Sequence, residues 1–272
     1  MKIAVSSDMH LDINHLAVND VIDAQAAYLR AQSARYFFIA GDTFNDFTLT
    51  EDYVKRLQAK LPTTTVKFLA GNHDMLKGIT YDQLMAQPVP EYFNNQFVDL
   101  PGTNWRIIGN NGWYDYSFAD QLQRSPEQFW HWKKAYWTDG QIDQPITDPQ
   151  RETLVLQQIK SQLSAARKAG KRVGLITHFV PHHHFIRYTN DDRFFNVANG
   201  MLGSRRLEQT IDQYHVPLVV FGHLHRHFQP ITIKDTRYYN PAIGYRAHRH
   251  DEWLKRDFIS EWKAQTNFFE FF

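Results

Sequence analysis

The sequence of 272 residues contains no cysteine. Disulfides, thiolate zinc sites and cysteine nucleophiles are therefore excluded, and an intracellular origin fits this composition. Long apolar runs are also missing at the N-terminus, where the segment from Met1 to Asp8 is too short for a signal peptide or a membrane span. We therefore expect a cytoplasmic protein with no membrane partner.

A strong charge of either sign is absent as well. Lys and Arg number 30 against 29 Asp and Glu, which gives a formal net charge of +1. The sequence has no basic stripe of the kind that a dedicated nucleic-acid surface would need, and nothing in the composition indicates an oligomeric state.

The hydrophobic content of 43% is enough for a substantial core, so the composition excludes a disordered protein. The length is compatible with one α/β domain over residues 1–272.

Apolar periodicity in the first 70 residues predicts alternating strands and helices. Strands are expected over residues 2–7, 36–40 and 65–70, and helices over residues 18–33 and 51–61, the second of which stops before Pro62. This order predicts a sheet with helices packed on it.

The rest of the chain continues this pattern with one interruption. Strands are expected over residues 97–100, 105–108, 172–177 and 217–221, helices over 152–168 and 204–214, and a hairpin from 231–233 to 237–239. Ser204 is expected to cap its helix, and the apolar tail 268–272 to dock as a strand or at an interface. Residues 112–149 are rich in Trp and Tyr, and we expect them to form an insertion or cap on the domain.

Five short polar blocks each follow an apolar, strand-like run. They read Asp8-Met9-His10, Gly41-Asp42, Gly71-Asn72-His73-Asp74, Thr177-His178 and Gly222-His223-Leu224-His225. In an extended backbone, residues at i and i+2 project to the same side, so the first and last blocks can each direct two side chains to one place. Asp42 stands between these flanking sets. A carboxylate can bridge two metal ions, and Asp42 is the natural candidate for that role.

This set of Asp, His and Asn side chains suits two hard or borderline divalent metals held side by side. Two ions roughly 3.5–4 Å apart lower the pKa of a shared water, and they hold both the attacking and the leaving oxygen of a phosphoester. The blocks therefore predict cleavage of a phosphoester by a metal-bridging hydroxide.

The order of the blocks resembles that of the calcineurin-like metallophosphoesterase superfamily. Residues 240–244, Asn-Pro-Ala-Ile-Gly, resemble the loop that follows the last motif in many members, so the resemblance covers nearly the whole chain. It implies an α/β fold in which a β-sandwich of two mixed sheets is flanked by helices, in four layers (αββα). It also implies a dinuclear-metal-dependent phosphoesterase.

Carried over position by position, the resemblance implies two overlapping ligand sets. The first metal would be held by Asp8, His10, Asp42 and His225, and the second by Asp42, Asn72, His178 and His223. His73 would be the histidine that binds no metal and acts at the scissile phosphate, as proton donor to the leaving group or as stabiliser of the transition state. The family takes Mn, Fe, Zn, Ni or Co, of which we favour Mn or Fe here.

One position departs from the family pattern. Many members read G-D-x-x-D, where the second Asp orients the catalytic histidine, but here Asn45 holds that position and Asp46 follows it. Three residues could therefore orient His73, namely Asn45, Asp46 or Asp74. An Asn partner would fix the tautomer of His73 without strengthening its basicity as a carboxylate does.

Residues around the substrate are less strongly indicated. At least one of His182, His183 and His184 could line the site. The aromatic residues of the insertion expected to come nearest to it are Trp113, Tyr114 and Tyr116, although we expect most aromatics there to pack in the core. The basic run 246–250, with His248 and His250, is expected to be a solvated face.

The expected substrate is a phosphorylated small molecule, most simply a small-molecule or nucleotide phosphodiester. A phosphomonoesterase or a nuclease would use the same site. The alternative from another class is a non-catalytic, metal-binding interaction module.

Overall fold

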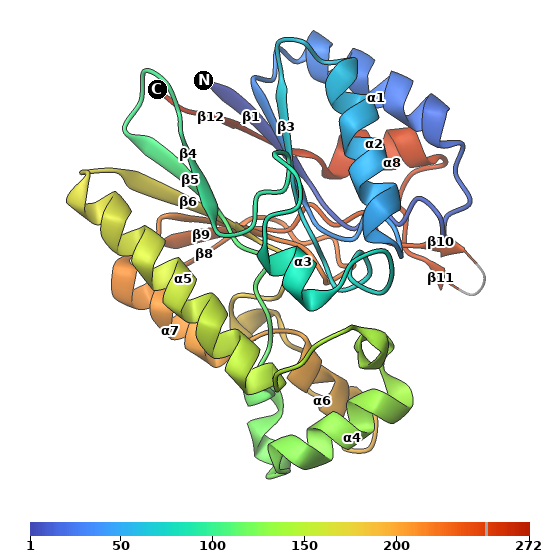
Figure 1. Cartoon of the computed structure of the whole chain (residues 1–272), viewed down its shortest axis with the longest axis vertical. Helices are drawn as coiled ribbons and strands as arrows, with labels where there is room; N and C mark the ends of the chain where they lie inside the picture. Colours follow the sequence, from blue (N-terminus) through green and yellow to red (C-terminus); the bar gives the residue numbers. More distant parts are fainter. Residues whose placement is uncertain (248–249) are drawn as a thin grey trace.

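Two sheets form the centre of the computed structural model, which describes residues 1–247 and 250–272 (Figure 1). The four-stranded sheet has the order β12-β1-β2-β3, with parallel strands β1 (Lys2–Ser6), β2 (Tyr36–Ala40) and β3 (Thr65–Leu69) and antiparallel β12 (Asn267–Glu270). The six-stranded sheet has the order β4-β5-β6-β7-β9-β8. Its strands are β4 (Gln96–Asp99), β5 (Trp105–Gly109), β6 (Arg172–Thr177), β7 (Leu218–Phe221), β8 (Ile231–Ile233) and β9 (Thr236–Tyr239).

Apolar side chains from both sheets form one core cluster between them. Ile3 and Val5 of β1 belong to this cluster together with Ile107 of β5, Ile176 of β6 and Val220 of β7. Alternate residues of a strand point to opposite faces, so Ala4 belongs instead to the larger cluster under the helices. The resulting packing of sheet on sheet is the sandwich that the family resemblance implied.

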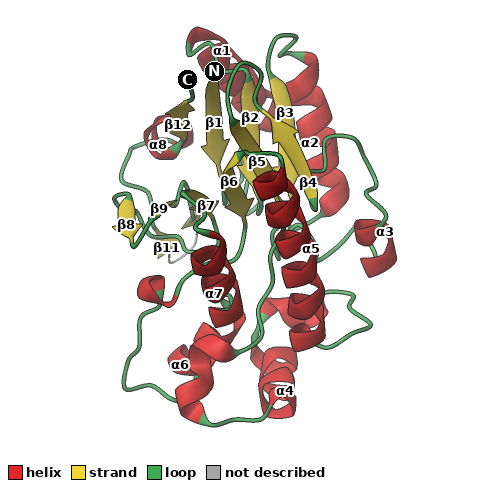
Figure 2. Cartoon of the chain, turned by 90° about the vertical axis from the view of Figure 1, so that its left-hand side faces the viewer, coloured by secondary structure: helices red, strands yellow, loops and turns green. Residues whose placement is uncertain are grey.

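Helices cover the outer face of each sheet. On the four-stranded sheet lie α1 (Val18–Ala31), α2 (Phe47–Ala59) and α8 (Phe258–Gln265), and on the six-stranded sheet lie α5 (Asp148–Lys168) and α7 (Arg205–Tyr214) (Figures 1 and 2). Trp262 of α8 packs edge-on against Phe37 on the outer face of β2. The molecule therefore has the four-layer αββα arrangement.

The insertion predicted over residues 112–149 lies at the end of the molecule away from the two termini (Figure 1). It contains α4 (Pro126–Tyr136) and two 3₁₀ turns, Ser117–Leu122 and Thr138–Gln141, and it packs beside α6 (Phe195–Ala198) and the 3₁₀ turn Asn199–Met201. The remaining short elements are α3 (Tyr81–Met85), the turn His183–Phe185, and the hairpin of β10 (Arg246–Ala247) and β11 (His250–Asp251). The role of the insertion as a cap stays a prediction.

Most expected elements are present, but two helices begin earlier than expected because capping residues set their first turns. The helix expected over 51–61 begins at Phe47 because Asp46 caps it, and the helix expected from 152 begins at Asp148 because Thr147 and Gln150 form a capping box. Ser204 caps α7 as predicted, through the N–H of Arg206.

The apolar tail docks as predicted, as the strand β12 beside β1. His248 and the side chain of His250 lie outside the described residues. No helix in the described part of the chain is both long and apolar enough to cross a bilayer.

Candidate metal centre

The five polar blocks meet at one edge of the sandwich. They follow β1, β2 and β3 of one sheet and β6 and β7 of the other, and each lies at the carboxyl end of its strand. These strands are parallel to their neighbours within each sheet, so their carboxyl ends point to the same side. Topology therefore brings together residues that lie more than 200 positions apart in the sequence.

The backbone at these strand ends is tightly turned. Asp8 and His10 have φ of 56° and 44°, so the extended conformation expected for this block was wrong, and left-handed turns produce the convergence instead. Neighbouring side chains also come so close to the backbone at Gly71 and Gly222 that only glycine fits there. A Cβ at Gly71 would overlap the carboxylate of Asp42, and a Cβ at Gly222 would overlap Ser7 and Asp8.

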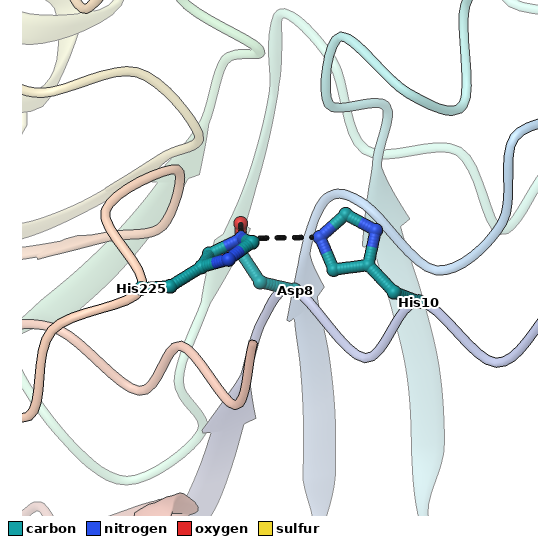
Figure 3. A group of neighbouring side chains, drawn as sticks. All are labelled: Asp8, His10 and His225. Atoms are coloured by element: carbon teal, nitrogen blue, oxygen red, sulfur yellow. Dashed lines mark hydrogen bonds and ion pairs between the residues drawn. The ribbon is translucent and has the colours of Figure 1, made fainter. Parts of the chain in front are cut away.

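The first predicted ligand set converges on a small buried volume. The Nε2 atoms of His10 and His225 lie 3.1 Å apart, and Nε2 of His225 lies 3.3 Å from Oδ1 of Asp8 (Figure 3). Two ligands at right angles on an ion with bonds of 2.0–2.2 Å are about 3 Å apart. The spacing of the two imidazoles therefore matches a shared ion.

The second set presents lone pairs to one another. Nδ1 of His178 donates to the carbonyl of Ala40 at 2.9 Å, so Nε2 of this neutral ring is an acceptor. This Nε2 faces Oδ1 of Asn72 at 3.1 Å and Oδ2 of Asp42 at 3.4 Å. His223 completes the set, with its buried Nε2 lacking a hydrogen-bond partner. Facing acceptors in a buried site are stabilised by a cation between them.

Asp42 lies between the two sets. Its Oδ2 is 3.4 Å from Nε2 of His178 and 3.8 Å from Nε2 of His10, while its Oδ1 accepts from the backbone N–H of His73. Burial, and next the charge of Asp8, raise the pKa of Asp42 well above its usual value. Such a concentration of carboxylates is stabilised by the charge of bound cations.

His225 carries a proton at pH 7 in the metal-free protein. Burial alone would lower the pKa of His225, but the carboxylates of Asp8 and Glu252 outweigh it and raise this pKa to about 9. Burial likewise opposes the effect of His225 on Asp8, whose pKa nevertheless falls to about 2. Metal binding at this position would displace the proton of His225.

His73 lies beside the ligands and is oriented by Asn45. Its Nδ1 donates to Oδ1 of Asn45 at 2.6 Å, and its Nε2 is 3.2 Å from the hydroxyl of Tyr245. Burial, and next the charge of His225, lower the pKa of His73 to about 3, so the ring is neutral at pH 7.

The other two candidates for orienting His73 have different partners. Asp46 accepts from the N–H groups of Thr48 and Leu49 at the start of α2. Asp74 accepts from the backbone N–H groups of Asp42, Thr43, Phe44 and Gly71, which fixes the two loops after β2 and β3. The carboxylates of Asp46 and Asp74 therefore hold backbone groups, and the residue that orients His73 is Asn45.

The sequence missed two acidic residues that hold the ligands. Oε2 of Glu252 lies 2.9 Å from Nδ1 of His225, and Oδ1 of Asp139 accepts from Nδ2 of Asn72 at 2.8 Å. These contacts direct Nε2 of His225 and Oδ1 of Asn72 towards the centre. Neither acid follows a strand that the sequence predicted, so the pattern that identified the ligands gave no signal for them.

The candidate substrate residues Trp113, Tyr114 and His182 are buried among other side chains. Trp113 and Tyr114 are fully buried and stacked on each other, and Nε1 of Trp113 donates to Asp148. Tyr114 interacts with Asp139 behind Asn72. His182 is buried against Glu208, with Nε2 3.5 Å from Oε1, and belongs to a separate group of polar side chains.

The chain belongs to the calcineurin-like phosphoesterase family, whose model matches residues 1–227. The protein is therefore a metal-dependent phosphoester hydrolase of the metallophosphoesterase type, a family that uses a dinuclear divalent metal centre. The described side chains fit such a centre because they provide converging acceptors, and His223 leaves its buried Nε2 without a hydrogen bond.

Solved structures with the same fold are distant in sequence. A phosphopantetheinyl hydrolase from Mycobacterium tuberculosis is 17% identical with a TM-score of 0.66, over 97% of this chain and 92% of that one. A dimetal phosphatase from Danio rerio is 12% identical with a TM-score of 0.53, over 88% and 86%. GAP50 of Plasmodium, described as the anchor in the inner membrane complex, is 12% identical with a TM-score of 0.51, over 90% and 72%. No curated protein matches the sequence.

Proposed function

We propose that this protein hydrolyses a small-molecule phosphodiester, such as a nucleotide diester, with two manganese or iron ions. The observation that carries the proposal is the pair of ligand sets that share Asp42, with His73 beside them. His73 is neutral at pH 7 and adds no positive charge of its own. A diester carries one negative charge where a monoester carries up to two, so it places a smaller demand on the positive charge of the site.

Two further observations support a small substrate. The near-neutral net charge of +1 does not favour a nucleic acid as the dedicated partner. One protein of similar fold is named a phosphopantetheinyl hydrolase, and that name denotes a small organic group. The cytoplasmic location that the sequence favours stays a prediction.

The residues divide the work of hydrolysis. Two bound divalent ions would supply an activated water and neutralise charge on the phosphate. Asp42 holds the two ligand sets together, and Ala40 and Glu252 fix the tautomers of His178 and His225. Asn45 keeps a proton on Nδ1 of His73 and leaves Nε2 as an acceptor. In this state Nε2 of His73 carries no proton for the leaving oxygen.

The test compares a chromogenic diester, bis-p-nitrophenyl phosphate, with the monoester p-nitrophenyl phosphate on manganese-loaded protein. We expect faster hydrolysis of the diester, and a loss of at least about a hundredfold in Asp42→Asn. Asp143→Asn, at an exposed hydrogen bond to the N–H of Tyr81, is the matched control. The proposal fails if the diester is not cleaved, or if Asp42→Asn leaves its cleavage intact.

Three other functions give different results. A monoesterase would prefer p-nitrophenyl phosphate, and a nuclease would show salt-dependent retention on single-stranded DNA. A non-catalytic interaction module would bind metal and cleave neither ester. Against this last alternative, the chain keeps all seven predicted ligand positions and His73.

A further inference from the structure

Tyr245 lies directly against the metal centre, although no sequence pattern indicated it. Its ring centroid is 4.4 Å from that of His10 and 4.6 Å from that of His225. Its hydroxyl lies 3.2 Å from Nε2 of His73. The side chain therefore contacts two predicted ligands through its ring and the candidate catalytic histidine through its polar end.

The backbone holds Tyr245 in this position at three points. Its N–H donates to Oε2 of Glu252 at 2.7 Å, and its carbonyl accepts from the N–H of Glu252 at 2.9 Å. The N–H of the preceding Gly244 donates to the carbonyl of Asp8 at 3.0 Å. Glu252 also bonds His225, so one carboxylate orients a metal ligand and fixes the tyrosine beside it.

The direction of the hydrogen bond at His73 determines which group carries a proton there. Because Nδ1 donates to Asn45, Nε2 is an acceptor and the hydroxyl of Tyr245 is the donor. A substrate oxygen that enters beside His73 therefore meets a hydroxyl donor from Tyr245, whereas the nitrogen of His73 offers a lone pair.

We propose that Tyr245 is a further catalytic residue, whose hydroxyl donates a hydrogen bond to the leaving-group oxygen while the ester is cleaved. The inference rests on the proposed hydrolysis of a phosphoester and applies equally to a monoester or a diester. His73 then acts as the acceptor that holds the hydroxyl in place before the substrate binds.

The test uses Tyr245→Phe, which keeps the ring against His10 and His225 and removes only the hydroxyl. Manganese-loaded wild type and variant are assayed on methyl aryl phosphodiesters whose leaving groups range from p-nitrophenol to phenol. A poor leaving group depends most on hydrogen bonding, so we expect kcat to fall about tenfold on the phenyl ester and less on the p-nitrophenyl ester, with KM little changed. Tyr136→Phe, at an exposed tyrosine of α4, is the matched control.

Two readouts do not depend on turnover. Manganese content, measured by mass spectrometry, should be the same in wild type and Tyr245→Phe. Binding of inorganic phosphate to the manganese-loaded protein, measured by calorimetry, should weaken about tenfold in the variant because the phosphate loses one hydrogen bond.

An equal loss of kcat on every ester overturns the proposal, and so does a loss of manganese, which would give Tyr245 a structural role only. If the wild type cleaves no ester, the proposed function fails, and the phosphate measurement then decides alone. Unchanged phosphate affinity in Tyr245→Phe would overturn the role of Tyr245 in that case.

Discussion

The pair of His73 and Asn45 sets the chemistry of this site at the scale of single residues. A carboxylate at the position of Asn45 would stabilise a protonated His73, whereas the amide oxygen accepts a hydrogen bond without adding negative charge. Burial, and next the charge of His225, lower the pKa of His73, so the ring is neutral, and its proton lies on Nδ1 because Asn45 accepts there. With Nε2 of His73 an acceptor, the hydroxyl of Tyr245 is the hydrogen-bond donor at this place.

Asn45→Asp should restore the basicity of His73. We expect the pKa of His73 to rise from about 3 by roughly one unit or more, because a negative charge then faces Nδ1. Nitrogen-15 NMR of the imidazole in the metal-free protein measures this pKa. Asn190→Asp adds the same charge on an exposed loop and serves as control. An unchanged or lower pKa in Asn45→Asp would contradict the role assigned to Asn45.

At the scale of elements, the predicted insertion over residues 112–149 makes buried polar contacts with the metal centre and with α5. Asp139, in the 3₁₀ turn after α4, accepts from Asn72. Lys133 of α4 bonds the carboxylate of Asp148, the first residue of α5. The orientation of Asn72, in the loop after β3, thus depends on Asp139, far along the chain.

Asp139→Asn should weaken metal binding at the second predicted ligand set. The substituted amide can donate to Oδ1 of Asn72 and turn it from the centre, so we expect manganese affinity there to fall about 10–100-fold. A manganese titration followed by electron paramagnetic resonance measures both sites. Asp143→Asn is the control from the same segment, and equal manganese affinities in wild type and Asp139→Asn would refute the link.

Another buried acid, Glu152 of α5, affects how the stability of the fold depends on pH. Both carboxylate oxygens of Glu152 are buried and lack a hydrogen-bond partner, and burial, followed by the charge of Asp115, raises its pKa well above the usual value. Because the folded-state pKa lies above that of the unfolded chain, about 4.3, this residue reduces stability increasingly as the pH rises above that value.

Glu152→Gln should therefore stabilise the fold at pH 8 and much less at pH 5. An amide removes the need to bury a charge or bind a proton, so we expect a gain of about 1 kcal/mol, or roughly 2–4 °C in Tm, at pH 8. Thermal denaturation at the two pH values measures it, with the exposed Glu270→Gln as control. A loss of stability at pH 8 would show that the charged form is the favoured one.

At the scale of the whole molecule, the centre joins two sheets. Asp8, Asp42 and Asn72 come from the four-stranded sheet, and His178 and His223 from the six-stranded sheet. Bound ions would therefore link the two halves of the sandwich and stabilise the folded state.

Removal of metal should accordingly lower the thermal stability. With metal at a hundredfold excess over its dissociation constant, binding contributes about 2.7 kcal/mol, so a chelator should lower Tm by roughly 5–10 °C. Differential scanning calorimetry with and without chelator measures this change. Asp42→Asn should show little response, and a wild-type Tm that does not respond to the chelator would argue against a link between the sheets.

The sequence predicts well which of the candidate ligands come together, because each follows a strand and parallel strands bring their carboxyl ends together. It fails for Asp139, Tyr245 and Glu252, whose positions depend on loops that return to the centre from elsewhere. Asp8 and His10 show an intermediate case. Their convergence was foreseen from an extended backbone, but it comes from left-handed turns, which the spacing of two residues does not reveal.

The most direct test of the central claim is anomalous diffraction from crystals of the manganese-loaded protein. The account predicts two manganese peaks on either side of the Asp42 carboxylate, about 3.5–4 Å apart, with His73 beside them and bound to neither. A single peak at the centre, or manganese found only at His182, His183 and Glu208, would contradict it.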